Sequence, residues 1–158
     1  GRNAVYLAGR GYQVTALDAN ATGLAKALRL AAERGVDLAT LCVDLEDYRW
    51  EPAAWDAIVS IWCHLPSILR RRVYADIVQA LKPGGVVLLE SYTPEQRGRG
   101  TGGPKDVDLL STAADLTREF AGLQILRVEE NVREVVEGTG HRGISSVVQL
   151  VAIKEAAC

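Results

Sequence analysis

Short apolar runs that alternate with helix-like segments constrain the fold of this chain more than any other feature. Strand-like runs are expected at residues 12–17, 38–43, 57–62 and 86–89, with helices between Asn20 and Gly35 and over residues 67–81. Runs that are apolar on both faces are typical of parallel strands covered by helices. The alternation therefore predicts an α/β fold built on a parallel sheet.

The last third of the chain follows a different pattern. A glycine-rich basic loop is expected at residues 93–105, and a short helix near 112–120. Two long strand-like segments, 123–136 and 144–154, are joined by a glycine-rich stretch. This arrangement predicts an antiparallel hairpin. Because neither repeats nor a linker interrupt the pattern, residues 1–158 are expected to form a single domain.

Composition excludes several classes of protein. The chain has 158 residues, of which 48% are hydrophobic and 24% are charged, as expected for a globular domain rather than a disordered one. A net charge of -2 argues against a nucleic-acid partner. Apolar runs are shorter than the roughly 20 residues of a membrane span. Three cysteines without a CxxC pair argue against a disulfide framework. We expect a reduced, cytoplasmic protein with no membrane partner.

The first residues have the pattern of a helix end. The chain contains no methionine, and residues 1–8 precede two helix-terminating glycines, Gly9 and Gly11. A helix this short with no capping residue ahead of it is marginal by itself. We therefore expect the sequence to begin inside a structural element.

Polar residues follow each expected strand. The strand ends carry Asp18, Asp44, His64 and the segment 90–92. In open α/β sheets, ligands bind outside the carboxyl ends of the strands. A carboxylate only accepts hydrogen bonds, so Asp18 suits the two hydroxyls of a ribose and Asp44 an adenine amino group. Both aspartates could instead cap a turn or a helix, and His64 could be structural or could line a substrate pocket.

The order of these motifs resembles the class I S-adenosylmethionine-dependent methyltransferases. The matching features are the strands ending at Asp18 and Asp44, the run WDAIVSI at residues 55–61, and LKPGG at 81–85, which is the most specific. The tellurite-resistance and thiol-methyltransferase-like branch is similar over further segments. These are residues 1–8, 63–66, 90–96, 102–110 and 137–152.

The resemblance implies a Rossmann-like, mostly parallel sheet with helices on both faces and strand order 3-2-1-4-5-7-6, its last hairpin being antiparallel. It implies S-adenosyl-L-methionine as cofactor. The implied cofactor-binding residues are Gly1, Arg2, Asn3, Asp18, Ala19, Asp44, Leu45 and Ile61. The implied catalytic residues are His64, His141 and Arg142, and the implied substrate-binding residues are Tyr92, Gln96 and Lys105.

The family's first strand and its glycine loop would lie ahead of Gly1. We therefore expect an N-terminally incomplete domain whose central strand is supplied by upstream residues or by another chain. A homodimer is one such arrangement.

The expected reaction is an SN2 methyl transfer to a small-molecule acceptor, such as a thiol or a chalcogen oxyanion. Positioning is the main requirement, so neither a metal nor a covalent intermediate is needed. An oxyanion could be held by the cationic side chains of Arg97, Arg99, Lys105 and Arg142. Two alternatives remain. One is an inactive, truncated relative acting as a dimeric interaction module, and the other is a nucleotide-binding oxidoreductase, which would need a GxGxxG loop.

Overall fold

The computed structural model describes residues 1–137 and 142–156. The chain divides into two compact units, Gly1–Arg49 and Trp50–Cys158, and each is described by itself. The prediction of a single domain stays a prediction. Among the described residues, the helices are all too short or too polar to cross a membrane.

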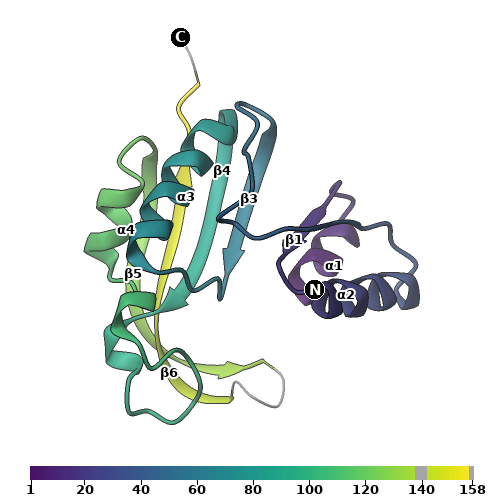
Figure 1. Cartoon of the computed structure of the whole chain (residues 1–158). Helices are drawn as coiled ribbons and strands as arrows, with labels where there is room; N and C mark the ends of the chain where they lie inside the picture. Colours follow the sequence, from purple (N-terminus) through teal and green to yellow (C-terminus); the bar gives the residue numbers. More distant parts are fainter. Residues whose placement is uncertain (138–141, 157–158) are drawn as a thin grey trace. The chain divides into compact units, whose positions relative to one another are not determined.

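The first unit contains two helices and a two-stranded parallel sheet (Figure 1). Its elements are α1 (Arg2–Ala8), β1 (Thr15–Asp18), α2 (Ala21–Glu33) and β2 (Ala39–Cys42). In the register of this sheet, Thr15 lies opposite Ala39 and Asp18 opposite Cys42. Both predicted strands and both helices are confirmed, and β1 is shorter than expected at its start.

Helix α2 begins and ends as its sequence predicts. The Asn20 side chain accepts a hydrogen bond from the Gly23 amide at 3.1 Å, which satisfies one of the free amides of the first turn. At the other end, Gly35 adopts φ +63°, a conformation that favours glycine. A Cβ on Gly1 would lie 2.3 Å from the Cβ of Ala27. The start of α1 therefore approaches α2 so closely that only glycine fits at this position.

The second unit is built on a four-stranded sheet with the order β3-β4-β6-β5. Its strands are β3 (Trp55–Ile61), β4 (Leu81–Tyr92), β5 (Gln124–Val136) and β6 (Arg142–Ile153). Strands β3 and β4 are parallel, whereas β6 is antiparallel to both β4 and β5. The hairpin prediction is confirmed. In the numbering of the expected order, in which strand 1 precedes β1, the small sheet corresponds to strands 3-2 and the larger sheet to strands 4-5-7-6.

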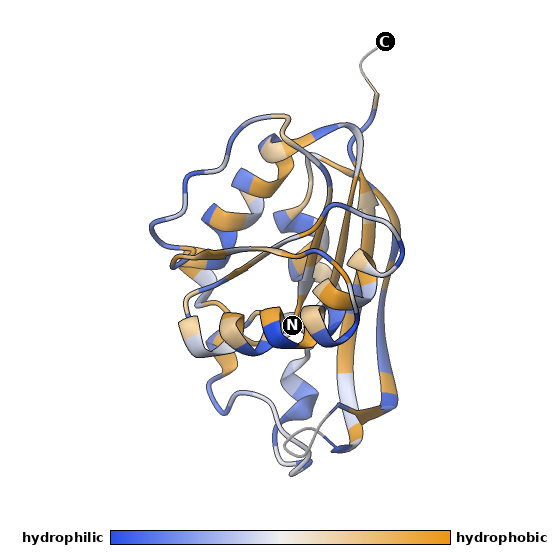
Figure 2. Cartoon of the chain, turned by 90° about the vertical axis from the view of Figure 1, so that its right-hand side faces the viewer, coloured by the Kyte–Doolittle hydropathy of each residue, from blue (hydrophilic) through white to orange (hydrophobic). Residues whose placement is uncertain are grey.

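Helices α3 (Ser67–Ala80) and α4 (Ala113–Glu119) cover one face of this sheet (Figure 1). Two short 3-10 helices, η1 (Pro94–Gln96) and η2 (Val107–Leu109), lie between β4 and α4. Apolar side chains from the helices and strands form the core, including Val73, Tyr74, Ile77, Val87, Leu89, Leu116, Phe120 and Leu150. The helices accordingly carry alternating hydrophobic and hydrophilic bands (Figure 2).

The LKPGG motif lies within the start of β4 rather than in a separate turn. Trp55 pairs with Leu81, and the next pair is Ala57 with Val86, so the motif bulges out of the ladder. Gly84 has φ +79°. A Cβ on Gly85 would lie 2.8 Å from the carbonyl oxygen of Lys82 and 3.1 Å from that of Trp55. The glycines are therefore required by this bulge.

Helix α4 begins with a capping box that stabilises its first turn. Thr112 Oγ1 accepts from the Asp115 amide at 3.1 Å, and the Asp115 carboxylate accepts from the Thr112 amide at 3.0 Å. Thr112→Ala should lower the free energy of unfolding by about 1 kcal/mol, measured by urea unfolding followed by circular dichroism. Thr117→Ala, on the exposed side of the same helix, is the matched control and should change it by less than about 0.5 kcal/mol.

The capping box also has a defined pH dependence. Burial would raise the pKa of the Asp115 carboxyl, but the hydrogen bonds from Thr112 and the charges of Arg118 and Arg70 together lower the pKa. Because the pKa in the folded state is lowered, the stabilisation is present above the ordinary carboxyl pKa and is lost as the pH falls through the lowered value. The difference between wild type and Thr112→Ala should therefore shrink in acid. An undiminished difference would contradict this origin.

Candidate functional site

The carboxyl ends of β1 and β2 present two oriented carboxylates at one edge of the first unit. Asp18 Oδ1 accepts from the Asn20 amide at 2.9 Å, and Asp44 Oδ1 accepts from the Glu46 amide at 2.9 Å. Both residues are exposed. The ladder continues past Asp18, whose carbonyl accepts from the Val43 amide at 3.2 Å. The parallel pairing therefore brings Asp18 and Asp44 to the same edge, as predicted.

These residues fit the ribose and adenine of a nucleoside cofactor. A turn amide fixes one oxygen of each carboxylate, and a carboxylate has about four acceptor positions, so further acceptor capacity remains for hydroxyl or amino donors. Ala19 and Leu45 directly follow the two strand ends, and Leu45 is half-buried. Gly1, Arg2 and Asn3 lie exposed at the start of α1. The individual cofactor contacts of all these residues stay predictions.

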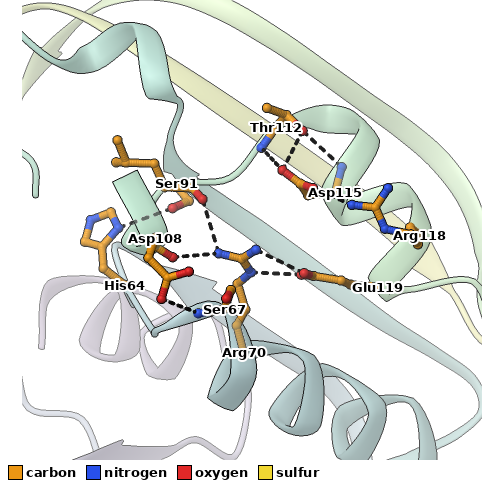
Figure 3. Close-up of polar contacts among 10 residues, drawn as sticks. His64, Ser67, Arg70, Ser91, Asp108, Thr112, Asp115, Arg118 and Glu119 are labelled. Atoms are coloured by element: carbon orange, nitrogen blue, oxygen red, sulfur yellow. Dashed lines mark hydrogen bonds and ion pairs between the residues drawn. The ribbon is translucent and has the colours of Figure 1, made fainter. Parts of the chain in front are cut away.

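In the second unit, the ends of β3 and β4 bring His64 beside Ser91 and Tyr92. Figure 3 shows the contact between His64 and Ser91. His64 Nδ1 lies 3.3 Å from Ser91 Oγ. The imidazole is nearly parallel to the Tyr92 ring, with centroids 5.5 Å apart and planes at 8°. Burial raises the pKa of the Tyr92 phenol, and the charge of Glu137 adds to that effect. An imidazole so placed can orient a nucleophile or take its proton.

Trp62 completes this cluster, although it is not among the site residues predicted from the sequence. Its ring stacks on Tyr92 with centroids 4.4 Å apart, and its indole N–H donates to Glu137 Oε2 at 2.6 Å. The φ of Trp62 is +58°, which is unusual for any residue other than glycine. A bulky aromatic residue directly after an apolar strand was the available sequence signal. Its partner Glu137 lies 75 residues further on, and no local pattern points to it.

Gln96 is buried and ties the glycine-rich loop to β6. Its Nε2 donates to Thr101 Oγ1 at 2.9 Å and to the Gly102 carbonyl at 3.0 Å, and its Oε1 accepts from the Ser146 amide at 2.8 Å. A Cβ on Gly103 would lie 2.9 Å from the Tyr92 ring. The glycine-rich loop is therefore anchored over Tyr92, and an acceptor-binding role for Gln96 stays a prediction.

The other predicted site residues have simpler positions. Ile61 ends β3 opposite Glu90. Lys105 is exposed between η1 and η2, and Arg142 is exposed at the start of β6, opposite Val136. His141 lies outside the described residues. Contacts of these four residues with an acceptor or cofactor stay predictions.

Arg70 is buried although its position in the sequence predicts the opposite. Leu69, Val73 and Ile77 form an apolar stripe at four-residue spacing on α3, and Arg70 lies off that stripe, which predicts a solvated side chain. The prediction is wrong, because Arg70 is only 5% exposed. It donates to both carboxylate oxygens of Glu119, at 2.9 and 3.0 Å, and to the carbonyls of Asp108 and Leu110 (Figure 3). Burial alone would lower the pKa of the guanidinium, but the hydrogen bond and charge of Glu119 outweigh it and raise the pKa.

Comparison with known families identifies the fold. The model of a family described as a methyltransferase domain matches residues 1–85, which is more than half of the chain. The chain belongs to this methyltransferase family. Among curated proteins, none matches.

Solved structures agree with this assignment. The chain is 20% identical to a protein described with the conversion of a disulfide bond into a thioacetal group during echinomycin biosynthesis, covering 100% of this chain and 72% of that one, with a TM-score of 0.80. TehB from Haemophilus influenzae is 20% identical over 98% of this methyltransferase and 54% of TehB, with a TM-score of 0.76. The N-methyltransferase NodS from Bradyrhizobium japonicum, in complex with S-adenosyl-L-homocysteine, is 14% identical to this chain. The match covers 90% of this chain and 66% of NodS, with a TM-score of 0.66. At these identities the likeness establishes the fold.

The methyltransferase domain fixes the cofactor as S-adenosylmethionine. When bound, the cofactor supplies a methyl group on a sulfonium, which is already a good leaving group. The residues of this chain therefore have to bind the cofactor, orient the acceptor and exclude water.

Asp18 provides a direct test of cofactor binding. Asp18→Asn removes a charge that strengthens the hydrogen bonds to the ribose hydroxyls, so the Kd for S-adenosylhomocysteine should rise about tenfold or more in calorimetric titration. Asp37→Asn alters an equally exposed carboxylate just before β2, at the opposite end of that strand, and is the matched control. Equal affinities of all three proteins would remove Asp18 from the cofactor site.

The Arg70–Glu119 pair is expected to be strongly coupled. Arg70→Met leaves a carboxylate buried without its charge partner and should lower the free energy of unfolding by about 3–5 kcal/mol. Adding Glu119→Gln removes that uncompensated charge, so the double variant should be more stable than Arg70→Met alone. Arg71→Met, on the exposed side of the helix, should change the stability by less than about 0.5 kcal/mol in the same urea measurement.

Proposed function

We propose that this methyltransferase transfers the methyl group to a soft nucleophile on a small molecule, either a thiol or a chalcogen oxyanion. The observation that carries the proposal is the placement of His64 against Ser91 and Tyr92 at the ends of two parallel strands, where ligands bind in such sheets. A partly buried imidazole beside a hydroxyl and an aromatic ring suits a small, weakly acidic acceptor.

Sulfur chemistry among the structural neighbours supports this acceptor class. The first neighbour is described with a reaction that converts a disulfide bond into a thioacetal. The structural likeness to TehB agrees with the sequence resemblance of several segments to the tellurite-resistance branch, which favours a chalcogen oxyanion as an acceptor. The net charge of -2 gives no support to a nucleic-acid substrate.

The reaction needs little from the protein beyond position and proton transfer. The acceptor lone pair forms a bond to the methyl carbon, while the bond between that carbon and the sulfonium sulfur breaks and leaves its electron pair on sulfur. A thiol acceptor also loses its proton, which the His64 imidazole takes before passing it to solvent. An oxyanion needs no such base, and exposed cations such as Lys105 and Arg142 would then help to hold it.

Methyl transfer by the protein as its gene encodes it tests the proposal. Thiols and tellurite are offered with S-adenosylmethionine, and formation of S-adenosylhomocysteine is measured together with the methylated product. His64→Gln should lower kcat for thiols about 10²-fold, in line with loss of a general base, and affect tellurite much less. Tyr12→Leu, which removes a 65% exposed ring in the first unit, serves as control.

The outcomes separate the candidate functions. Cofactor binding without methylation of any thiol or oxyanion would overturn the proposed acceptor class. Absence of cofactor binding, combined with a dimer in sedimentation analysis, would favour the inactive interaction module.

A further inference from the structure

Strand β5 is the last strand of the four-stranded sheet and has no neighbouring strand on its outer edge among the described residues. Its inner edge pairs antiparallel with β6, and the register shifts only between Ile125 and Arg127. Beyond this bulge, residues 127–136 form a regular edge. Every second residue of an edge strand directs its N–H and C=O groups outward, where another strand can bind them.

The centre of this edge is accessible. Val132 is 60% exposed, and Glu130 and Glu134, which flank it on the same face, are exposed as well. On the opposite face, the side chains of Glu129 and Arg133 are each 33% exposed. Both faces of the strand therefore present side chains that a further strand would contact.

Symmetry limits how this edge can pair with the same edge of a second copy. When two identical edges pair antiparallel, a two-fold axis perpendicular to the sheet relates them, and opposite residues lie on the same face of the sheet. Each possible register is therefore centred on one residue, which faces its own copy. The charged side chains that decide between the registers are those of Arg127, Glu129, Glu130, Arg133 and Glu134.

Most registers bring like charges together. A register centred on residue 129, 130, 133 or 134 makes a charged side chain face its own copy. A register centred on Val132 places Glu130 opposite Glu134. Like charges directly opposite each other destabilise strand pairing, so these registers are disfavoured.

The register centred on Asn131 avoids like-charge pairs. Glu129 of each copy then faces Arg133 of the other, so this pair of opposite charges occurs twice by symmetry. On the other face, Glu130 faces Val132. Opposite charges across a strand pair stabilise it. The charge pattern of the edge thus specifies one self-complementary register.

The two charged side chains of this pair are already oriented within one copy. Glu129 accepts from the Asn131 side chain at 2.6 Å, and Arg133 donates to the Glu90 carboxylate at 2.9 Å. A carboxylate has about four acceptor positions and a guanidinium five donors, so each retains capacity for a further partner.

We propose that the outer edge of β5 is an interaction surface for a second copy of this chain, which pairs antiparallel in the register centred on Asn131. The four-stranded sheet then continues across the two-fold axis. The interface lies at the edge opposite β3, so it does not replace the central strand expected ahead of Gly1. It is independent of the methyl acceptor, and it reaches the candidate site because Arg133 also donates to Glu90 and Glu137.

Sedimentation equilibrium of the protein as its gene encodes it tests the interface through opposite changes at one exposed position. Wild type should form a dimer. Since residue 132 faces Glu130 in the proposed register, Val132→Lys should lower the Kd of the dimer about three- to tenfold, and Val132→Glu should raise it about tenfold. Both variants change the same exposed side chain, which makes them matched controls for folding. Ile68→Glu, at a 79% exposed position on α3, should leave the Kd unchanged.

A cysteine at the centre of the register gives a second test. Asn131 faces its own copy at a Cα separation of about 4.5–5.5 Å, which a disulfide can span. Asn131→Cys should therefore form a cross-linked dimer on mild oxidation. Glu134→Cys should not, because residue 134 faces residue 128 and lies far from its own copy. Wild type is oxidised alongside to account for the native cysteines.

Other results would overturn the inference in distinguishable ways. A wild type that stays monomeric at its highest soluble concentration would show that no second copy binds. Protection of the β5 amides from hydrogen exchange in that monomer would show that another segment of the chain covers the edge. If Val132→Lys and Val132→Glu both raise the Kd, the register is wrong, and if neither changes it, the dimer uses another surface. These measurements need no acceptor, so they are separate from any failure of the proposed function.

Discussion

The parallel pairing of β3 with β4 is the constraint on which the candidate acceptor site depends. The register places Ile61 opposite Glu90, and the ladder extends one residue further through the Trp62 amide. Since both strands end at the same edge, the residues that follow β3 must lie beside Ser91 and Tyr92. The contact between His64 and Ser91 and the stack of Trp62 on Tyr92 both follow from this register. A shift of one residue would turn these side chains to the opposite face.

Buried polar groups then fix the segments that cross the strand ends. Arg70 ties α3 to Glu119 and to the carbonyls of residues 108 and 110, while Gln96 joins the glycine-rich loop to β6. Leu110 packs with Tyr92 in one apolar cluster, so the position of the η2 segment affects the aromatic rings directly. Buried polar networks of this kind specify a single arrangement because each unsatisfied group would be costly. Residues with no contact to a ligand can thus shape the site.

The chemistry of methyl transfer explains why such a site suffices. The leaving group is supplied with the cofactor, so rate depends on holding the acceptor in line and removing water. Oriented carboxylates at the ends of β1 and β2 suit cofactor binding, and aromatic rings with an imidazole at the ends of β3 and β4 suit a soft acceptor. The same strand-end geometry thus suits both roles, each within its own unit of the chain.

The sequence alone determined the elements whose signals are local. The Asn20 cap, the positive φ of Gly35 and the apolar stripe of α3 depend on residues a few positions apart. The hairpin of β5 and β6 depends on two strand-like segments that follow each other directly in the sequence. The acidic strand ends were predictable for the same reason. Three contacts follow from tertiary packing instead: Arg70 is buried against Glu119, Gln96 anchors a loop, and Trp62 donates to Glu137. These contacts join residues 49 to 75 positions apart, and a side chain finds such a partner only when the packed strands and helices bring it there.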